Sequence, residues 1–262
     1  MTKAALATAL LLSMVCLPSG RIHATELFED VIEKTVALEG ASTFSLTAVD
    51  GVVQIYGSSN ADVKITATRK AFSLARLNAM QIRVEATPGA LHCMTTSAPQ
   101  PKGGWRDTSG TVDYVVELPQ NIRFVSVAVP NGELVINGLR GSEVTATLGN
   151  GRATMRNCFC NQNLRVGSGG FDLIFDWAEP LALVIDASIS NGNARALISA
   201  DAAFHVQAHA LSGHVASDFT EMKERKTRVG GGELDQHFGT GPESTVKLRA
   251  DRGNIRLTEV VW

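Results

Sequence analysis

A glycine returns about every 20 residues along this chain, each time between two short stretches of alternating apolar residues. From Gly132 to Gly253 the spacing is 18 to 23 residues, and apolar side chains recur three, five and seven residues before the glycine and two and four after it. A period of two on both sides of a glycine predicts two short strands that meet at a corner, each burying one face. In the repeat of Gly151 the apolar positions hold Val144, Ala146, Leu148, Ala153 and Met155.

A unit of this size cannot bury a face alone, so several units must stack into one continuous core. A meander of hairpins and a solenoid would both satisfy the period of two. The constant offsets and the small inward residues favour the solenoid. We therefore predict an all-β fold, a single-stranded β-helix (β-solenoid) with coils of about 20 residues stacked in chain order. The predicted corners are Gly51, Gly89, Gly132, Gly151, Gly169, Gly192, Gly213, Gly232 and Gly253.

Three segments interrupt the repeat without the length to form a separate domain. Residues 70–80 have helical spacing and predict one short outlying helix. Residues 95–109 are rich in proline and glycine and predict a loop. Residues 220–230 are highly charged and predict an excursion before the last coils. The sequence thus predicts one β-solenoid domain over residues 25–262.

Residues 1–24 have the pattern of a secretory signal peptide. Lys3 supplies the positive start, an apolar run follows, and Ala24 is a small residue suited to cleavage. Cys16 lacks the small preceding residue that a lipidation signal requires, so simple cleavage is predicted, with an uncleaved anchor as the alternative. Export to the periplasm or the cell surface follows. No later apolar run is long enough to span a bilayer, so contact with a membrane would be peripheral.

Charge argues against one class of partner. Residues 25–262 carry 22 basic and 26 acidic side chains, because Lys3 and Arg21 are the only charges in the first 24 residues. A general nucleic-acid binder needs a strong basic excess, so we expect no nucleic-acid partner.

Several phrases of the sequence carry a resemblance. They are DGVVQIYGSSNADVKITATRK, VDYVVELPQN and VAVPNGELVINGLRGSEVTATLGNG. Together with the repeat they resemble the bacterial β-strand-repeat proteins known as putative adhesins, of unknown function, over roughly residues 36–260. The resemblance implies an exported single-stranded β-helix, and it transfers no catalytic residue to this chain.

Cysteine and histidine residues are the first candidates for chemistry. Cys158 and Cys160, two apart on a predicted strand, would suit a soft metal or a redox pair, or else packing with an occasional disulfide; the inward position favours packing. His205 and His209 are predicted to face outward, and His214 lies beyond a corner. These imidazoles occupy different positions of the repeat, so we predict solvated histidines and no metal or other cofactor.

An enzyme of polysaccharide cleavage needs carboxylates paired across neighbouring coils, or an Asp/Lys/Arg group in a groove. Three residues after the corner, the equivalent positions include Asp172 and Arg195, and six residues before it they include Asp186 and Lys247, with no adjacent acids in either set. The sequence therefore favours an adhesin-like envelope binding or scaffold protein without catalysis. The alternative is a periplasmic β-helix polysaccharide lyase or hydrolase.

Basic side chains recur at outward positions in the C-terminal half. Equivalent outward side chains on neighbouring coils lie about 4.8 Å apart, so they form a ladder. An anionic envelope glycan or an envelope protein is the predicted partner of this stripe. A solvated face neutralised by Glu221, Glu224 and Glu243 is the alternative. The candidate ligand-binding residues are Arg165, His209, Lys226, Arg228, Lys247 and Arg249.

Overall fold

A computed structural model describes residues 26–38, 43–97, 110–219, 225–226 and 232–260. The predicted signal peptide lies outside these residues, as do most of the predicted 95–109 loop and most of the 220–230 excursion. The described chain is all-β, as predicted, and its strands belong to one sheet. The elements are β1 (Phe28–Ala37), β2 (Thr43–Thr47), β3 (Gly51–Ser58), β4 (Asp62–Ala71), α1 (Leu74–Ala79), β5 (Met80–Thr87), β6 (Ala90–Ser97), β7 (Thr111–Pro119), β8 (Phe124–Asn137), β9 (Glu143–Arg156), β10 (Asn161–Phe175), β11 (Val184–Ser199), β12 (Phe204–Ser212), β13 (Val215–Ser217), β14 (Arg225–Lys226), β15 (Gly232–Phe238), β16 (Ser244–Arg252) and β17 (Ile255–Val260).

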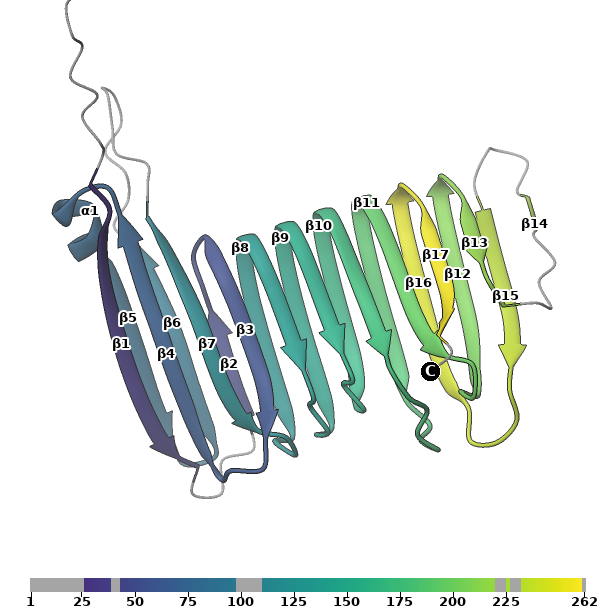
Figure 1. Cartoon of the computed structure of the whole chain (residues 1–262), viewed down its shortest axis with the longest axis horizontal. Coiled ribbons are helices and arrows are strands. Elements are labelled where there is room, and N and C mark those ends of the chain that lie inside the picture. Colours follow the sequence, from purple (N-terminus) through teal and green to yellow (C-terminus); the bar gives the residue numbers. More distant parts are fainter. Residues whose placement is uncertain (1–25, 39–42, 98–109, 220–224, 227–231, 261–262) are drawn as a thin grey trace, which may run out of the picture.

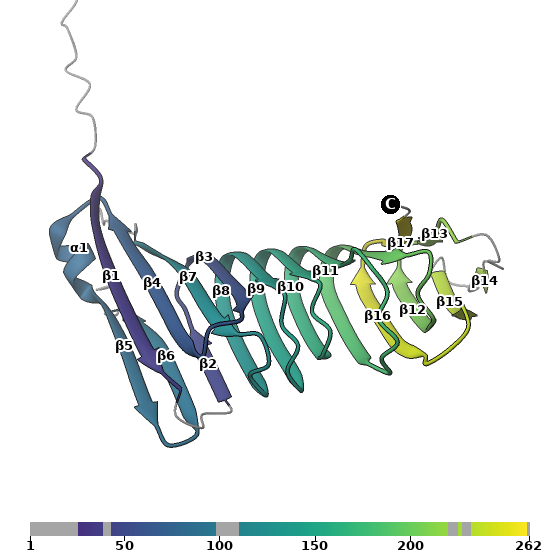
Figure 2. The ribbon, with the colours of Figure 1, turned by 60° about the horizontal axis from the view of Figure 1, so that its bottom comes forward.

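The strands lie side by side in one long row, from β1 at one end to β14 at the other (Figure 1). In the middle of the row, β8, β9, β10 and β11 each run unbroken through their corner glycine and pair in parallel with equivalent residues in register. We call the part of each repeat before the glycine the first arm and the part after it the second arm. Figure 2 shows the same row from a second direction.

The side chains predicted to face inward form the core. Those of β9 are at most 2% exposed: Val144, Ala146, Leu148, Ala153 and Met155. The residues between them are exposed or half-buried. Both arms therefore bury one face each, as the period of two in the sequence predicts. The small inward alanines recur in β11, where Ala187, Ala194 and Ala196 are at most 1% exposed.

The corner glycines are required by two separate features of the geometry. Gly132, Gly151 and Gly169 have φ between +124° and +135°, a region that residues with a Cβ rarely adopt. They also stack on one another. A Cβ on Gly151 would lie 1.8 Å from the carbonyl oxygen of Gly132, and one on Gly169 would lie 1.9 Å from that of Gly151. Beside the glycines, Asn150 donates to the Asn131 side chain at 2.7 Å.

The repeats do not stack in chain order, and in this respect the prediction is wrong. The last repeat, β16 and β17, lies between the repeat of β11 and the repeat of β12 and β13. Its Gly253 would place a Cβ 1.7 Å from the carbonyl oxygen of Gly192, and Gly213 would place one 1.9 Å from that of Gly253. The row of corners therefore passes from Gly192 to Gly253 and then to Gly213.

Two of the predicted corners are wrong as well. Gly89 lies in the turn between β5 and β6, which pair antiparallel as a hairpin. Gly232 begins β15, which pairs antiparallel with β12 and with β14. Both are near the ends of the row, where a strand has no further repeat to pair with. The edge strand β5 there exposes Gln81, Arg83 and Glu85, and charged side chains on an edge discourage pairing with another chain.

The helix predicted within residues 70–80 is present. It is α1 (Leu74–Ala79), capped by the Ser73 hydroxyl, which accepts a hydrogen bond from the Arg76 N–H. Leu77 is buried against the core and Phe72 is exposed. In the described residues no helix has the length and hydropathy needed to cross a membrane.

Candidate functional site

Four of the six predicted ligand-binding residues lie on the outer face of the first arm. Arg165 is on β10, His209 on β12, and Lys247 and Arg249 on β16, and all four side chains are exposed. Lys226 belongs to β14 by its backbone. Arg228 lies outside the described residues.

The order of the strands changes which of these residues are neighbours. Arg165 pairs with Ser188, Ser188 with Arg249, and Arg249 with His209 across adjacent parallel strands. The prediction by chain order, in which His209 would follow Ser188, is wrong here because β16 lies between β11 and β12. Lys247 lies two residues before Arg249 on the same face. We call Arg165, Lys247, Arg249 and His209 the basic row.

Acidic side chains flank the basic row. Arg249 donates from Nε to Asp251 at 3.1 Å. Lys247 lies between Asp186 and Gln207 on the adjacent strands. His209 is opposite Glu233 on β15. Of the acids predicted to neutralise this face, Glu243 instead contacts His237 at 2.5 Å, and Glu221 and Glu224 lie outside the described residues.

The three histidines of the β12–β13 repeat occupy separate places, as predicted. His205 stacks on His237 with ring centroids 4.0 Å apart, and its Nε2 lies 2.5 Å from the Asp235 carboxylate. The hydrogen bond from His205 lowers the pKa of Asp235. His209 belongs to the basic row, and His214 follows the corner at Gly213.

Cys158 and Cys160 lie in the short connection between β9 and β10, so the prediction of a strand there is wrong. Both are free thiols and fully buried, as is Cys93. The Cys158 thiol donates to the carbonyl of Arg156 at 3.5 Å. Burial raises the pKa of Cys158 and of Cys93 to about 11, and it raises the pKa of Cys160 as well. These thiols pack as small apolar side chains.

Because thiolate is the reactive form, we expect these three cysteines to resist alkylation in the folded protein at about pH 8. Because burial raises the pKa of each thiol, the thiol stays protonated at pH values at which an exposed cysteine would ionise. Iodoacetamide labelling followed by peptide mass spectrometry measures this, with protein unfolded in guanidinium chloride as the positive control. Full labelling of Cys158 in the folded protein would contradict its buried position.

A charged cluster on the outer face of the second arm was not among the predicted site residues. Its centre is Asp172 on β10, whose side chain is only 5% exposed. Arg152 on β9 donates from Nε and Nη2 to Oδ2 of Asp172 at 2.8 and 2.5 Å. Arg195 on β11 donates from Nε to Oδ1 at 2.6 Å. The hydrogen bond to Asp172 raises the pKa of Arg195.

An open hollow of about 400 Å³ lies beside this cluster. It has a simple cause in the sequence. Gly170 is the strand partner of both Arg152 and Asn193, so the position between these two outward side chains is empty. The hollow is lined by Gly151, Arg152, Gly169, Gly170, Phe171, Asp172, Asn193 and Arg195.

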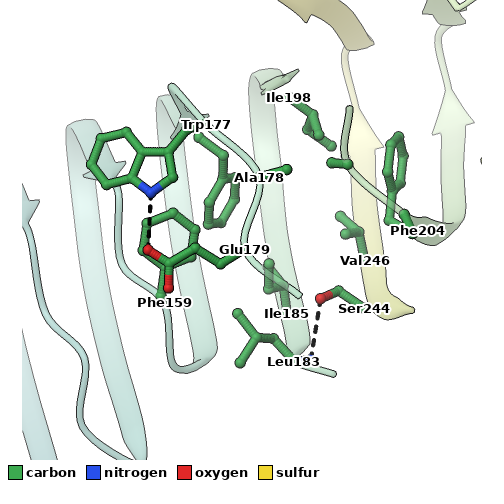
Figure 3. A pocket seen from close by; sticks show the side chains of 13 residues that line it. Phe159, Trp177, Ala178, Glu179, Leu183, Ile185, Ile198, Phe204, Ser244 and Val246 are labelled. Carbon is green, nitrogen blue, oxygen red and sulfur yellow. Dashed lines mark hydrogen bonds between the residues drawn. The ribbon is translucent and has the colours of Figure 1, made fainter. Parts of the chain in front are cut away.

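A second cavity lies under the connection between β10 and β11 (Figure 3). Its walls are mostly apolar and include Phe159, Trp177, Ile185 and Val246, and the Trp177 indole donates to Glu179 at 2.9 Å. Its volume is about 40 Å³. A single water needs roughly 10–15 Å³ of such space, and ligand pockets begin near 300 Å³. This cavity therefore has room for water but not for a ligand of ordinary size.

The sequence held a partial signal for the charged cluster. Asp172 and Arg195 stand at equivalent positions of consecutive repeats, three residues after their glycines, so their contact could have been inferred. Arg152 stands one residue after its glycine and reaches Asp172 diagonally, which spacing alone does not indicate. The burial of Asp172 beneath the two arginines emerges only from the structure.

Comparison with known proteins gives a likeness of fold. No family model matches this chain, and no curated protein matches it. The chain is similar to the crystal structure of a putative cell adhesion protein from Clostridium sporogenes, with 13% identity and a TM-score of 0.54 over 90% of this chain and 100% of that chain. It also aligns with a putative adhesin from Bacteroides fragilis (10% identity, TM-score 0.32, covering 87% of this chain and 97% of that one). A putative lipid binding protein from Parabacteroides distasonis aligns at 11% identity and a TM-score of 0.31, covering 89% and 97%. The first likeness concerns the fold alone, and the other two are too distant to support an argument.

Proposed function

We propose that this chain is an exported, single-domain, single-stranded β-helix that binds acidic polymers of the bacterial envelope as an adhesin-like or scaffold protein. The signal-peptide pattern of residues 1–24 supports export to the periplasm or the cell surface. The stacked repeats support the β-helix. The structure with the shared fold is named for cell adhesion, which fits a binding role.

The observation that carries the proposal is the basic row. Its Arg249 and His209 are partners on adjacent strands, and Arg165 lies on the same line with only Ser188 between. Strands in a sheet are about 4.8 Å apart, so Arg165 and Arg249 lie about 10 Å apart across Ser188, with Lys247 on the same face two residues before Arg249. A polymer with a repeating negative charge, such as a uronic-acid glycan or lipopolysaccharide, could contact these exposed cations in turn along its length.

The chemistry of Asp172 weighs against the hydrolase alternative. Hydrolysis of a glycosidic bond needs a carboxyl group that is able to exchange a proton with the substrate. Both oxygens of Asp172 are already engaged by arginine side chains. Asp172 therefore serves to hold charge in place, and we propose binding without catalysis.

Replacing Arg165, Lys247 and Arg249 with serine is expected to weaken retention of the protein on immobilised polygalacturonate. Removing three exposed positive charges should lower the salt concentration at elution to about half, because the attraction is screened by salt. Retention is measured by elution in a sodium chloride gradient, with circular dichroism to show that the fold is intact.

The control is a variant with serine at Lys34, Lys64 and Arg83, which are exposed side chains near the other end of the row. It loses the same net charge, so it should elute close to the wild type if the basic row is the binding surface. Equal losses in both variants would mean that net charge alone causes retention. Unchanged retention of the first variant would remove the basic row as the binding face.

A further inference from the structure

The Asp172 cluster is a pre-organised pair of guanidinium groups. A carboxylate that is 5% exposed holds Arg152 from one side and Arg195 from the other, while the two arginine side chains themselves remain 58% and 48% exposed. The three side chains together carry a net charge of +1. Fixed arginines lose less conformational entropy on binding a ligand than mobile ones do, so the arrangement favours recognition of an anion.

The two guanidinium groups retain donors for such an anion. Arg152 uses Nε and Nη2, and Arg195 uses Nε, in their bonds to Asp172. Within the part of the chain that the structure describes, Arg152 Nη1 and both terminal nitrogens of Arg195 make no hydrogen bond to protein. The neighbouring Arg256 differs, because its Nη2 donates to Asp218 at 3.1 Å.

The hollow beside the cluster supplies the space. Its volume of about 400 Å³ falls within the range of sites for small ligands, roughly 300–1,000 Å³. Gly170 keeps the floor of the hollow free of a side chain, and the exposed Asn193 amide stands opposite Arg152 across it. Side-chain amides and backbone groups of this kind hydrogen-bond to hydroxyls.

We infer that this hollow binds one carboxylated sugar unit, a uronate, with the sugar carboxylate between Arg152 and Arg195 and its hydroxyls toward Asn193. This inference rests on the proposed binding of acidic polymers and locates a specific subsite on the second arm, apart from the basic row. The net charge of +1 matches a single carboxylate, and the two terminal nitrogens of Arg195 form a fork that fits the planar geometry of that group. Glu133, the strand partner of Arg152 on β8, disfavours a more highly charged ligand.

The test is isothermal titration calorimetry with trigalacturonate, using its methyl ester and inorganic phosphate as comparison ligands. We expect wild-type protein to bind trigalacturonate and Arg195→Gln to bind it at least about tenfold more weakly, since a charge-assisted hydrogen bond is lost. Gly170→Gln should abolish binding by filling the hollow while keeping both arginines. A Cβ on Gly170 would approach the Asn193 carbonyl oxygen at 3.3 Å, so the strand accommodates it with a small adjustment.

Arg256→Gln is the matched control, because Arg256 is the strand partner of Arg195 but does not line the hollow. It should bind trigalacturonate within about twofold of the wild type, since the Arg256 guanidinium is already paired with Asp218 at 3.1 Å. An equal loss in Arg256→Gln and Arg195→Gln would overturn the inference in favour of general charge attraction. Equal binding of the methyl ester would overturn the role of the carboxylate, and tighter binding of phosphate would overturn the assignment to a uronate.

The basic-row variant separates this inference from the proposed function. With serine at Arg165, Lys247 and Arg249, trigalacturonate should still bind the hollow even though retention on the polymer is weakened. If this variant no longer bound trigalacturonate, the sugar would bind on the first arm. That result would overturn the inference and keep the proposed function. If the wild-type protein were retained on the polymer but did not bind trigalacturonate, the inference would again be overturned and the proposed function kept.

Discussion

Gly169→Ala is expected to prevent folding or to lower the free energy of unfolding by at least about 4 kcal/mol, a size reserved for severe backbone or core defects. Gly169 has φ +124°, and the new Cβ would lie 1.9 Å from the carbonyl oxygen of Gly151 on the adjacent strand. Relief would require the two repeats to separate at the corner, which would break the register of both arms. Soluble yield and thermal unfolding by circular dichroism measure the effect.

The next residue provides the control. Gly170 is also a glycine of β10, but its φ is not in the left-handed region, and its new Cβ would meet only the Asn193 carbonyl oxygen at 3.3 Å. Gly170→Ala should therefore change the melting temperature by only a few degrees. If the two variants melted at similar temperatures, the corner glycines would not be the stacked, strained positions described above.

The sequence predicts the cross-section of the fold well, because one physical constraint determines it. Residues two apart on a strand share a face, so Val144, Ala146 and Leu148 had to point the same way. Because burial of apolar surface is favourable, that face is the one turned inward. Positive φ at a corner leaves glycine as the residue of choice, which fixed the position of Gly151.

The order of the repeats could not be predicted in the same way. Each repeat presents the same kind of edge to its neighbour, a row of backbone N–H and C=O groups, and this edge carries little information about which repeat pairs with it. Ala250 of β16 pairs with Ile189 of β11 and with Ala210 of β12, and all three are small or medium apolar residues. The antiparallel strands that end the row, such as β15, have the same period of two as the parallel strands beside them.

How much of each candidate site could be predicted depends on whether its residues lie on repeats that are adjacent in the sequence. Arg195 and Asp172 belong to repeats that are adjacent both in sequence and in space, so their proximity was within reach of the sequence. Arg249 and His209 became neighbours only because β16 lies beside β12. The contacts of Arg152 depend further on side-chain direction across a diagonal, and the hollow depends on a glycine between two longer side chains.

Ile185→Asp is expected to prevent folding, because it places a carboxylate on the buried face of β11. Ile185 is 2% exposed and lines the small cavity beneath Trp177. Among the residues that line this cavity the one ionisable side chain is Glu179, which has the same sign as the new charge. A buried carboxylate without a partner costs several kcal/mol, comparable with the whole stability of a domain, roughly 5–15 kcal/mol.

Asp186→Ser tests the opposite face at the adjacent position. Asp186 is exposed and lies between Asn163 and Lys247 on the neighbouring strands, so its loss should change the free energy of unfolding by only ~0.5 kcal/mol. Urea titration of both variants measures the difference. Because a shift of register by one residue exchanges the two faces of a strand, similar stabilities for the two variants would mean that β11 does not have the assigned register. A folded Ile185→Asp with an unstable Asp186→Ser would place Asp186 inside, and the outward positions of Arg165 and Arg249, which share its face, would then be wrong as well.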